Sequence, residues 1–130
     1  MAGSFSDLLE NELLDHVFKT GAYAVPTNIY IELYTVAPTD AGGGTPVAGG
    51  SYARKVCDTW DAAAAGAIAN TGAITFAQAT GDWGEVVAFG IFDAITGGNF
   101  LAWADLTVNK TILTGDTAEF AAGELDVTLD

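Results

Sequence analysis

The second half of the chain is divided by glycine-containing turns into segments too short for ordinary helices. The turns fall at Thr71-Gly72, Thr80-Gly81-Asp82, Thr96-Gly97-Gly98-Asn99, Thr114-Gly115-Asp116 and Ala122-Gly123. Threonine, glycine, asparagine and aspartate favour tight turns, and short apolar segments between such turns are typical of antiparallel strands. The predicted strands are Ala67–Thr71, Ala73–Ala77, Glu85–Phe92, Asn99–Leu106, Lys110–Leu113 and Glu124–Leu129.

Two further strands are predicted upstream. Asn28–Val36 alternates apolar and polar residues, which places Ile29, Ile31 and Leu33 on one face. Ser51–Cys57 is the second. Strands and helices do not alternate after residue 21, so a parallel sheet is not expected. The expected fold class is mainly β: an antiparallel β-sandwich, jelly-roll-like, over residues 22–130, with one N-terminal amphipathic helix.

Residues 1–21 carry the signals of that helix. Ser4 and Asp7 have the spacing of a capping box, and Ser6 is a competing N-cap. Gly21 is a natural end for the helix. Apolar residues recur every four positions, and the stripe consists of Phe5, Leu9, Leu13 and Val17, widened by Leu8, Leu14 and Phe18. Two interpretations stay open: the stripe packs on the sheet, or it binds a partner.

A glycine-rich loop, Ala37–Gly50, separates the two upstream strands. It contains five glycines and two prolines, and loops longer than about 12 residues are usually functional or mobile. Ordering such a loop costs roughly 1–2 kcal/mol per residue in backbone entropy. We therefore expect residues 39–50 to form an arm that crosses onto a neighbouring subunit, with a flexible surface loop as the equal alternative.

Charge excludes several classes of partner. The 130 residues include 17 acidic and 4 basic side chains, for a formal net charge of −13. Binding to nucleic acid or to an anionic membrane surface requires clusters of lysine and arginine, and here only Arg54 and Lys55 are adjacent. No apolar run approaches the ~20 residues that span a bilayer. The length suits a single domain, residues 1–130, and the N-terminus lacks the basic region of a signal peptide.

The side chains needed for catalysis or for a transition-metal site are scarce. The chain has one histidine, His16, and one cysteine, Cys57. Nucleophilic catalysis needs a nucleophile with a base and an orienting group, and zinc needs about four nitrogen or sulfur ligands. His16 is interpreted as a helix-end cation and Cys57 as a small buried hydrophobe. Calcium is the least implausible metal, although no EF-hand spacing occurs. We expect no enzyme activity, cofactor or metal.

Aromatic residues leave a second binding class open. Trp83 lies in a Gly-Asp-Trp-Gly turn and is the best candidate for an exposed tryptophan, whereas Trp103 lies in a strand and is interpreted as core. With Trp60 and Tyr52, Trp83 could form a sugar-stacking platform. A role in the core or in a protein interface is favoured, because aromatic side chains dominate both.

Six segments resemble a family of small structural proteins of tailed bacteriophages. The resemblance covers nearly the whole chain and implies a noncatalytic component of the virion, made in the host bacterial cytoplasm. The segments are, in order, SFSDLLENELLDHVF, IYIELYTVAPTDAGGGT, GGSYARK, NTGAITFAQATGDWGEV, FGIFDAITGGNFLAWADL and AGELDVTLD.

The favoured location in the particle is the capsid surface, because the chain has no heptads or β-helical repeats of a fibre shaft. We expect a decoration or cement protein that binds the major capsid protein, or other virion proteins, and forms a homo-oligomer. The alternatives are a tail-fibre or receptor- or glycan-binding module, and a connector or tail accessory protein. The expected contact residues are Phe5, Leu9, Leu13 and Val17; Thr39, Asp40, Gly42, Gly43, Gly44, Thr45 and Pro46; and Trp83.

Overall fold

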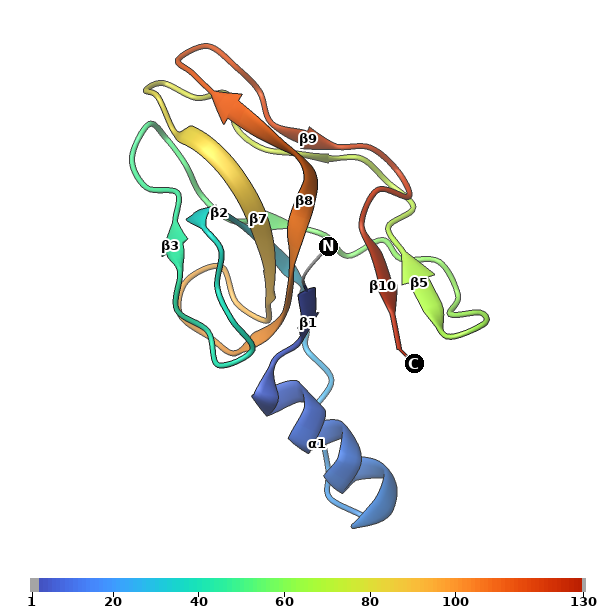
Figure 1. The fold of residues 1–130 in the computed structure, drawn as a ribbon. Coiled ribbons are helices and arrows are strands. Elements are labelled where there is room, and N and C mark those ends of the chain that lie inside the picture. The colour runs from blue at the N-terminus through green and yellow to red at the C-terminus, as the bar shows by residue number, and fades with distance from the viewer. Residues whose placement is uncertain (1–2, 130) are drawn as a thin grey trace.

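The computed structural model describes residues 3–129, which form short strands and one helix (Figure 1). In chain order the elements are β1 (Gly3–Phe5), α1 (Asp7–Phe18), β2 (Tyr30–Val36), β3 (Thr45–Pro46), β4 (Lys55–Val56), β5 (Ala67–Ala69), β6 (Ile74–Thr75), β7 (Gly84–Phe92), β8 (Phe100–Ile112), β9 (Glu119–Phe120) and β10 (Asp126–Thr128).

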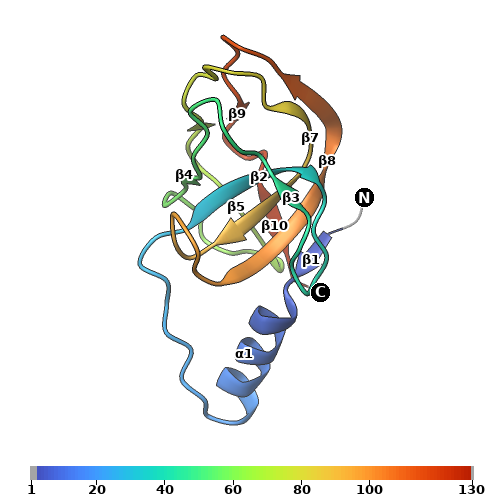
Figure 2. The same ribbon diagram turned by 90° about the vertical axis from the view of Figure 1, so that its left-hand side faces the viewer.

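Two layers of antiparallel strands make up the body of the molecule. The larger layer is a sheet of order β1-β8-β7-β2-β3. β4 pairs with the same edge of β2 as β3, farther along the strand. The facing layer consists of two separate ladders, β5 with β10 and β6 with β9. Figure 2 shows α1 outside both layers. The predicted mainly β, antiparallel, sandwich-like class with a single N-terminal helix is confirmed for the residues described.

The core lies between these layers. Ile31 and Leu33 of β2 meet Ile74 and Leu125 from the facing layer, and each of the four is at most 2 % exposed. The alternation predicted for β2 is therefore confirmed. Cys57 is buried as well. Burial raises the pKa of its thiol, so the reactive thiolate is disfavoured there.

Asn70 ties the two ladders of the facing layer together. Its buried side chain donates to the carbonyl oxygens of Gly72 (2.7 Å) and Ala121 (3.0 Å) and accepts from the amide of Leu125 (2.9 Å). One side-chain amide thus provides hydrogen-bond partners for three backbone groups that would otherwise be buried without any.

The sequence predicted two strands where the structure has one. β8 runs from Phe100 to Ile112, but its register with β7 is interrupted. Ala88 pairs with Asp105 and Val86 with Lys110, so the four residues 106–109 lie opposite the single residue Val87. The predicted break between Leu106 and Lys110 therefore corresponds to a large β-bulge within one strand.

The glycine-rich loop folds back onto its own sheet, so the predicted inter-subunit arm is wrong. A tight turn is closed by paired backbone bonds between Thr39 and Gly42, and β3 pairs with β2. Val47 then enters the core, where it is 4 % exposed. Gly44 permits this path because its φ is +74° and a Cβ there would lie 2.6 Å from the Val36 carbonyl oxygen.

The outer face of the sheet carries a buried ion pair. Glu32 of β2 is 7 % exposed, and one of its carboxylate oxygens lies 2.6 Å from Arg54 Nε. The guanidinium also donates to the carbonyl oxygens of Ala94 and Gly97, each at 2.8 Å, and its Cζ lies 3.6 Å from the centre of the Phe92 ring. Arg54 thereby holds the turn between β7 and β8 against the sheet.

Tyr34 lies on the same outer face, over a glycine. It is 4 % exposed, and a Cβ on Gly90 would lie 2.9 Å from its ring. Burial, followed by the nearby Glu32 carboxylate, raises the pKa of Tyr34 from 10.0 to about 12.

Alkaline pH is expected to destabilise the fold through this tyrosine. The unfolded chain loses the phenolic proton near pH 10 and the folded chain only near pH 12, so the folded state binds more protons between these values and stability falls as the pH rises. Between pH 10 and 12, the free energy of unfolding of the natural protein should fall by on the order of 2 kcal/mol more than that of the Tyr34→Phe variant. Denaturant unfolding at each pH gives the measurement. Equal losses in the two proteins would contradict this assignment.

Several elements differ from those predicted from the sequence. β1 lies in the segment assigned to the helix, and the predicted strand Ser51–Cys57 shrinks to β4. β3 and β9 have two residues each, too few to show any apolar period. Their strand conformation depends on long-range pairing with β2 and β6, which local pattern does not reveal.

Candidate interaction surface

Helix α1 begins at a buried serine that fixes it to the sheet. Ser6 Oγ accepts a hydrogen bond from the Leu9 amide (3.2 Å), so Ser6 is the N-cap, while Ser4 is not. The same hydroxyl donates to the Phe100 carbonyl oxygen (2.6 Å), and the Ser6 amide donates to the Leu101 carbonyl oxygen (2.8 Å). The first turn of the helix is therefore anchored to β8.

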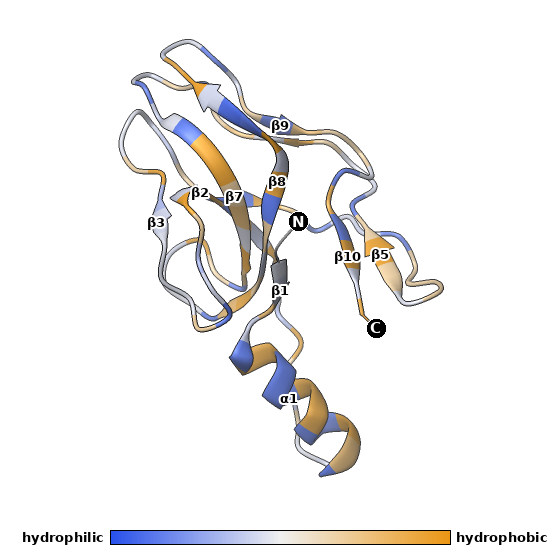
Figure 3. Cartoon of the chain, in the orientation of Figure 1, coloured by the Kyte–Doolittle hydropathy of each residue, from blue (hydrophilic) through white to orange (hydrophobic). Residues whose placement is uncertain are grey.

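Beyond that turn the helix stands away from the body (Figure 1). None of the twelve residues Asp7–Phe18 is buried. Phe5 and Leu9 pack against the core, whereas Leu14, Val17 and Phe18 are 57, 66 and 79 % exposed. Figure 3 shows the hydrophobic colour extending along the projecting helix. The interpretation in which the whole stripe packs on the sheet is wrong, because only its first turn reaches the body.

The chain returns to the body through an extended segment beside the helix (Figure 2). The amides of Lys19 and Gly21 both donate to the Asp15 carbonyl oxygen, which closes the helix end, and His16 Nδ1 lies 2.9 Å from the Gly21 carbonyl oxygen. Val25, in the returning segment, is 86 % exposed. We call residues 7–29, the helix with its return, the limb.

Asp40 joins the glycine-rich loop to the base of the limb. Its backbone oxygen accepts from the Asp7 amide (3.0 Å). Its carboxylate accepts from Ser4 Oγ and from Trp103 Nε1, the latter at 2.9 Å. Hydrogen bonds from Ser4 and then Trp103 lower the pKa of the Asp40 carboxyl group. Trp103, predicted as core, thus lies half-buried on the outer face.

The structure brings most of the predicted contact residues into one region. Asp40, in the turn Thr39–Gly42, is hydrogen-bonded to Asp7 at the base of the limb, where Phe5 and Leu9 pack against the core, and Leu13 and Val17 follow along the helix. Gly43, Gly44, Thr45 and Pro46 are exposed in the same hairpin. The exposed end of the limb, with Leu14 and Phe18, was noted in the sequence only as a widening of the stripe.

Trp83 is buried, so the prediction that its side chain is exposed is wrong. It is 5 % exposed, and its Nε1 donates to the Gly50 carbonyl oxygen at 2.9 Å. The ring packs edge-on against Tyr52 at 5.1 Å between centroids, and Tyr52 stacks with Phe76. Two residues of the predicted sugar platform, Trp83 and Tyr52, therefore belong to the core.

The described residues, 3–129, contain neither a candidate metal cluster nor a candidate membrane-spanning helix. Within that range, no three histidine, cysteine, aspartate or glutamate side chains gather closely enough to hold a metal ion. None of the helical sequence described has the length and apolar character needed to cross a membrane.

Comparison with known proteins identifies the family. The model of a family described as podophage GP4 fiber I protein gp80 matches residues 4–128. The chain belongs to this family. No curated protein matches the chain. Membership in the fibre family makes the protein a structural component of a tailed-phage virion, in line with the predicted resemblance, and implies contacts with other virion proteins. Family membership also points to a structural rather than an enzymatic role. Among the locations predicted from the sequence, the tail-fibre alternative fits the description of the family.

Proposed function

We propose that this protein is a noncatalytic subunit of a phage fibre and that the limb attaches it to another virion protein. The observation that carries the proposal is the exposure of Leu14, Val17 and Phe18 on a helix with no buried residue between Asp7 and Phe18. Burying one such side chain is worth about 1.5–3 kcal/mol. An isolated helix of this length is marginal in water, so docking would stabilise the helix as well.

Charge defines the partner that fits the limb. The helix carries four carboxylates and one histidine, and Lys19 follows at its end; the carboxylates are Asp7, Glu10, Glu12 and Asp15. A second copy would bring the same carboxylates into contact, which like-charge repulsion disfavours. A different virion protein with an apolar groove and a basic rim is complementary to the limb.

The experiment is complementation of a phage that lacks this gene. The triple variant Leu14→Ser, Val17→Ser and Phe18→Ser should fold normally and be incorporated into virions at least about tenfold less than the natural chain. The matched control replaces three exposed apolar residues of the body by serine: Val56, Leu113 and Leu129, which are 39, 49 and 61 % exposed. We expect the control protein to be incorporated normally.

The position of the chain in the particle is the second readout. Labelled protein should be found on fibres, in the few copies that a fibre requires. Hundreds of copies spread over the head would overturn the fibre assignment and favour the decoration role bound to the major capsid protein. Normal incorporation of the triple variant would overturn the role of the limb.

A further inference from the structure

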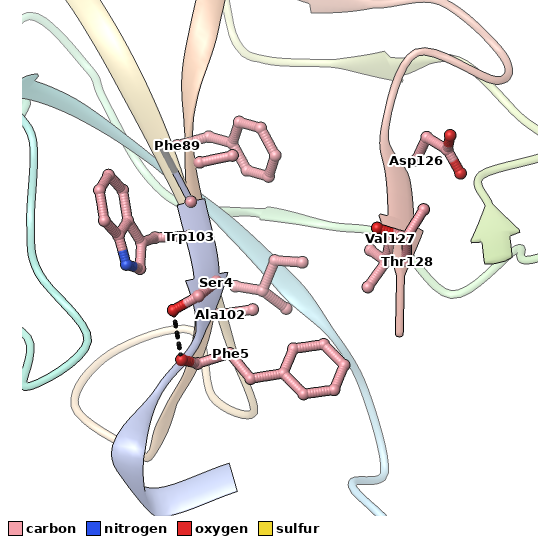
Figure 4. Close-up of a pocket in the computed structure, with 11 residues that line it drawn as sticks. Ser4, Phe5, Phe89, Ala102, Trp103, Asp126, Val127 and Thr128 are labelled. Carbon is pink, nitrogen blue, oxygen red and sulfur yellow. Dashed lines mark hydrogen bonds between the residues drawn. The ribbon is translucent and has the colours of Figure 1, made fainter. Parts of the chain in front are cut away.

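The limb is fixed to the body at its base and stands on its own at its far end. At the base, Figure 4 shows Phe5 directed toward β10, and the Ser4 hydroxyl donates to the Phe5 carbonyl oxygen at 2.8 Å. Ser6 follows with its bonds to β8, and Leu9 packs against the core. Residues 10–18 are all exposed or half-buried. Tertiary packing therefore holds the start of α1 and leaves its end to the stability of the helix itself.

The last turn of α1 consists of residues with a weak helix preference. It contains Asp15, His16, Val17 and Phe18, and each of these residue types is less favourable in a helix than the leucines and glutamates that dominate the earlier turns. Helices of about 12 residues are marginal in water even when every residue favours the helix, and α1 has 12. The turn that presents Val17 and Phe18 is therefore the weakest part of the limb.

The residue that closes the helix adds to this weakness. The Gly21 amide donates to the Asp15 carbonyl oxygen, a closure in which the residue before Gly21 is left-handed. That residue is Thr20, with a φ of +57°. Glycine is usual at this position, because a β-carbon is strained at positive φ and a branched one most of all. The Thr20 hydroxyl donates to the Lys19 carbonyl oxygen (2.6 Å), but this contact is exposed and water can replace it. The helix thus closes at a cost that glycine would avoid.

We propose that Thr20 keeps the last turn of α1 partly unfolded in the free subunit, and that this turn becomes fully ordered only when the limb docks. This inference rests on the proposed function, because it concerns how the limb binds. A surface that is ordered for only a fraction of the time binds more weakly by that fraction. Thr20 is then a positioning residue: it sets the strength of attachment through the conformation of Val17 and Phe18.

Hydrogen exchange of the free, full-length chain tests the state of the last turn. The amides of residues 15–19 should exchange within about a hundredfold of the rate of an unstructured peptide, and the amides of β2 and β7, inside the sheet, far more slowly. Thr20→Gly should slow the exchange of residues 15–19 by about two- to fivefold. Thr20→Asn should slow it less, because asparagine adopts the left-handed conformation more readily than threonine but less readily than glycine. Exchange as slow as that of β2, or an unchanged rate in Thr20→Gly, would overturn the inference.

Ala65→Gly is the matched control for the backbone effect. Ala65 has a φ of +53° and lies exposed in a turn of the body, so this substitution relieves the same kind of strain away from the limb. It should leave the exchange of residues 15–19 unchanged. If Ala65→Gly slowed that exchange as much as Thr20→Gly does, the effect would not be local to the helix end, and the role of Thr20 would be wrong.

Competition for places in the virion tests the link to docking. A phage that lacks this gene is supplied with equal amounts of the natural chain and the Thr20→Gly chain, and mass spectrometry of purified virions gives their ratio. We expect the variant to be enriched by about two- to fivefold, because its last turn is ordered for more of the time. Ala65→Gly should be incorporated in proportion to its supply. Equal incorporation of the Thr20→Gly and natural chains would overturn the link between order and docking. The proposed function has a separate test in the triple serine variant, so the two failures are distinguishable.

Discussion

Replacing Arg54 by alanine is expected to lower the free energy of unfolding by about 3–5 kcal/mol. The change leaves the Glu32 carboxylate, 7 % exposed, without its counter-charge. It also removes the two hydrogen bonds to Ala94 and Gly97 that hold the turn between β7 and β8. Chemical denaturation of the purified variant gives the measurement.

Two further variants identify the cause of this loss. Arg54→Lys keeps the charge but loses the planar contact with Phe92 and the fixed donor geometry, so we expect an intermediate loss. The double variant Glu32→Gln with Arg54→Met removes both charges and should recover part of the stability lost in Arg54→Ala, because no charge is then left buried. A double variant less stable than Arg54→Ala would contradict the buried-charge explanation.

Trp83→Ala is the second substitution with a large expected effect, about 3–5 kcal/mol of destabilisation. The ring fills the space between Tyr52 and the Gly50–Gly81 backbone, which comes close because neither glycine has a side chain. Thermal and denaturant unfolding should both report the loss.

The single hydrogen bond of this tryptophan can be isolated by a smaller change. Trp83→Phe keeps most of the ring but leaves the Gly50 carbonyl oxygen without its donor, so we expect a loss of about 1–3 kcal/mol. Trp103→Phe is the matched control, since its Nε1 donates to the exposed Asp40 carboxylate, which water can solvate instead. A loss at Trp103 as large as that at Trp83 would argue against burial as the cause.

Local sequence signals predicted the elements whose pattern is self-contained. The Ser6 cap and the spacing of Leu9, Leu13 and Val17 indicated α1, and the alternation in β2 identified Ile31 and Leu33 as core. These features depend on residues a few positions apart. Elements that depend on distant pairing, such as β3 and β9, carry no such signal.

The environment of Trp83 shows why turn chemistry alone misleads. Glycine and aspartate around a tryptophan indicate a surface turn, and the chain does bend at Thr80 and Gly81. The indole nonetheless enters the core, because Gly50 from a distant loop supplies both the space and the hydrogen-bond acceptor. That loop was expected to leave the domain, so its contribution to the core could not be anticipated.

The candidate surface contains residues that the sequence singled out, but its geometry could not be predicted. The sequence of an amphipathic stripe is the same whether the helix lies on the sheet or projects from it. The contacts made by Ser6 and Leu9 show that only the first turn of the helix packs on the body. The bulge of β8 had one signal in the sequence, the break between Leu106 and Lys110. Its meaning depends on the register with β7.

Attachment of α1 to β8 through its first turn alone has a consequence for evolution and for engineering. Side chains beyond that turn contribute little to the body, so they are free to change without weakening the sandwich. Under the proposed attachment, new residues at Leu14, Val17 and Phe18 would change the virion protein that the limb binds and leave the scaffold as it is.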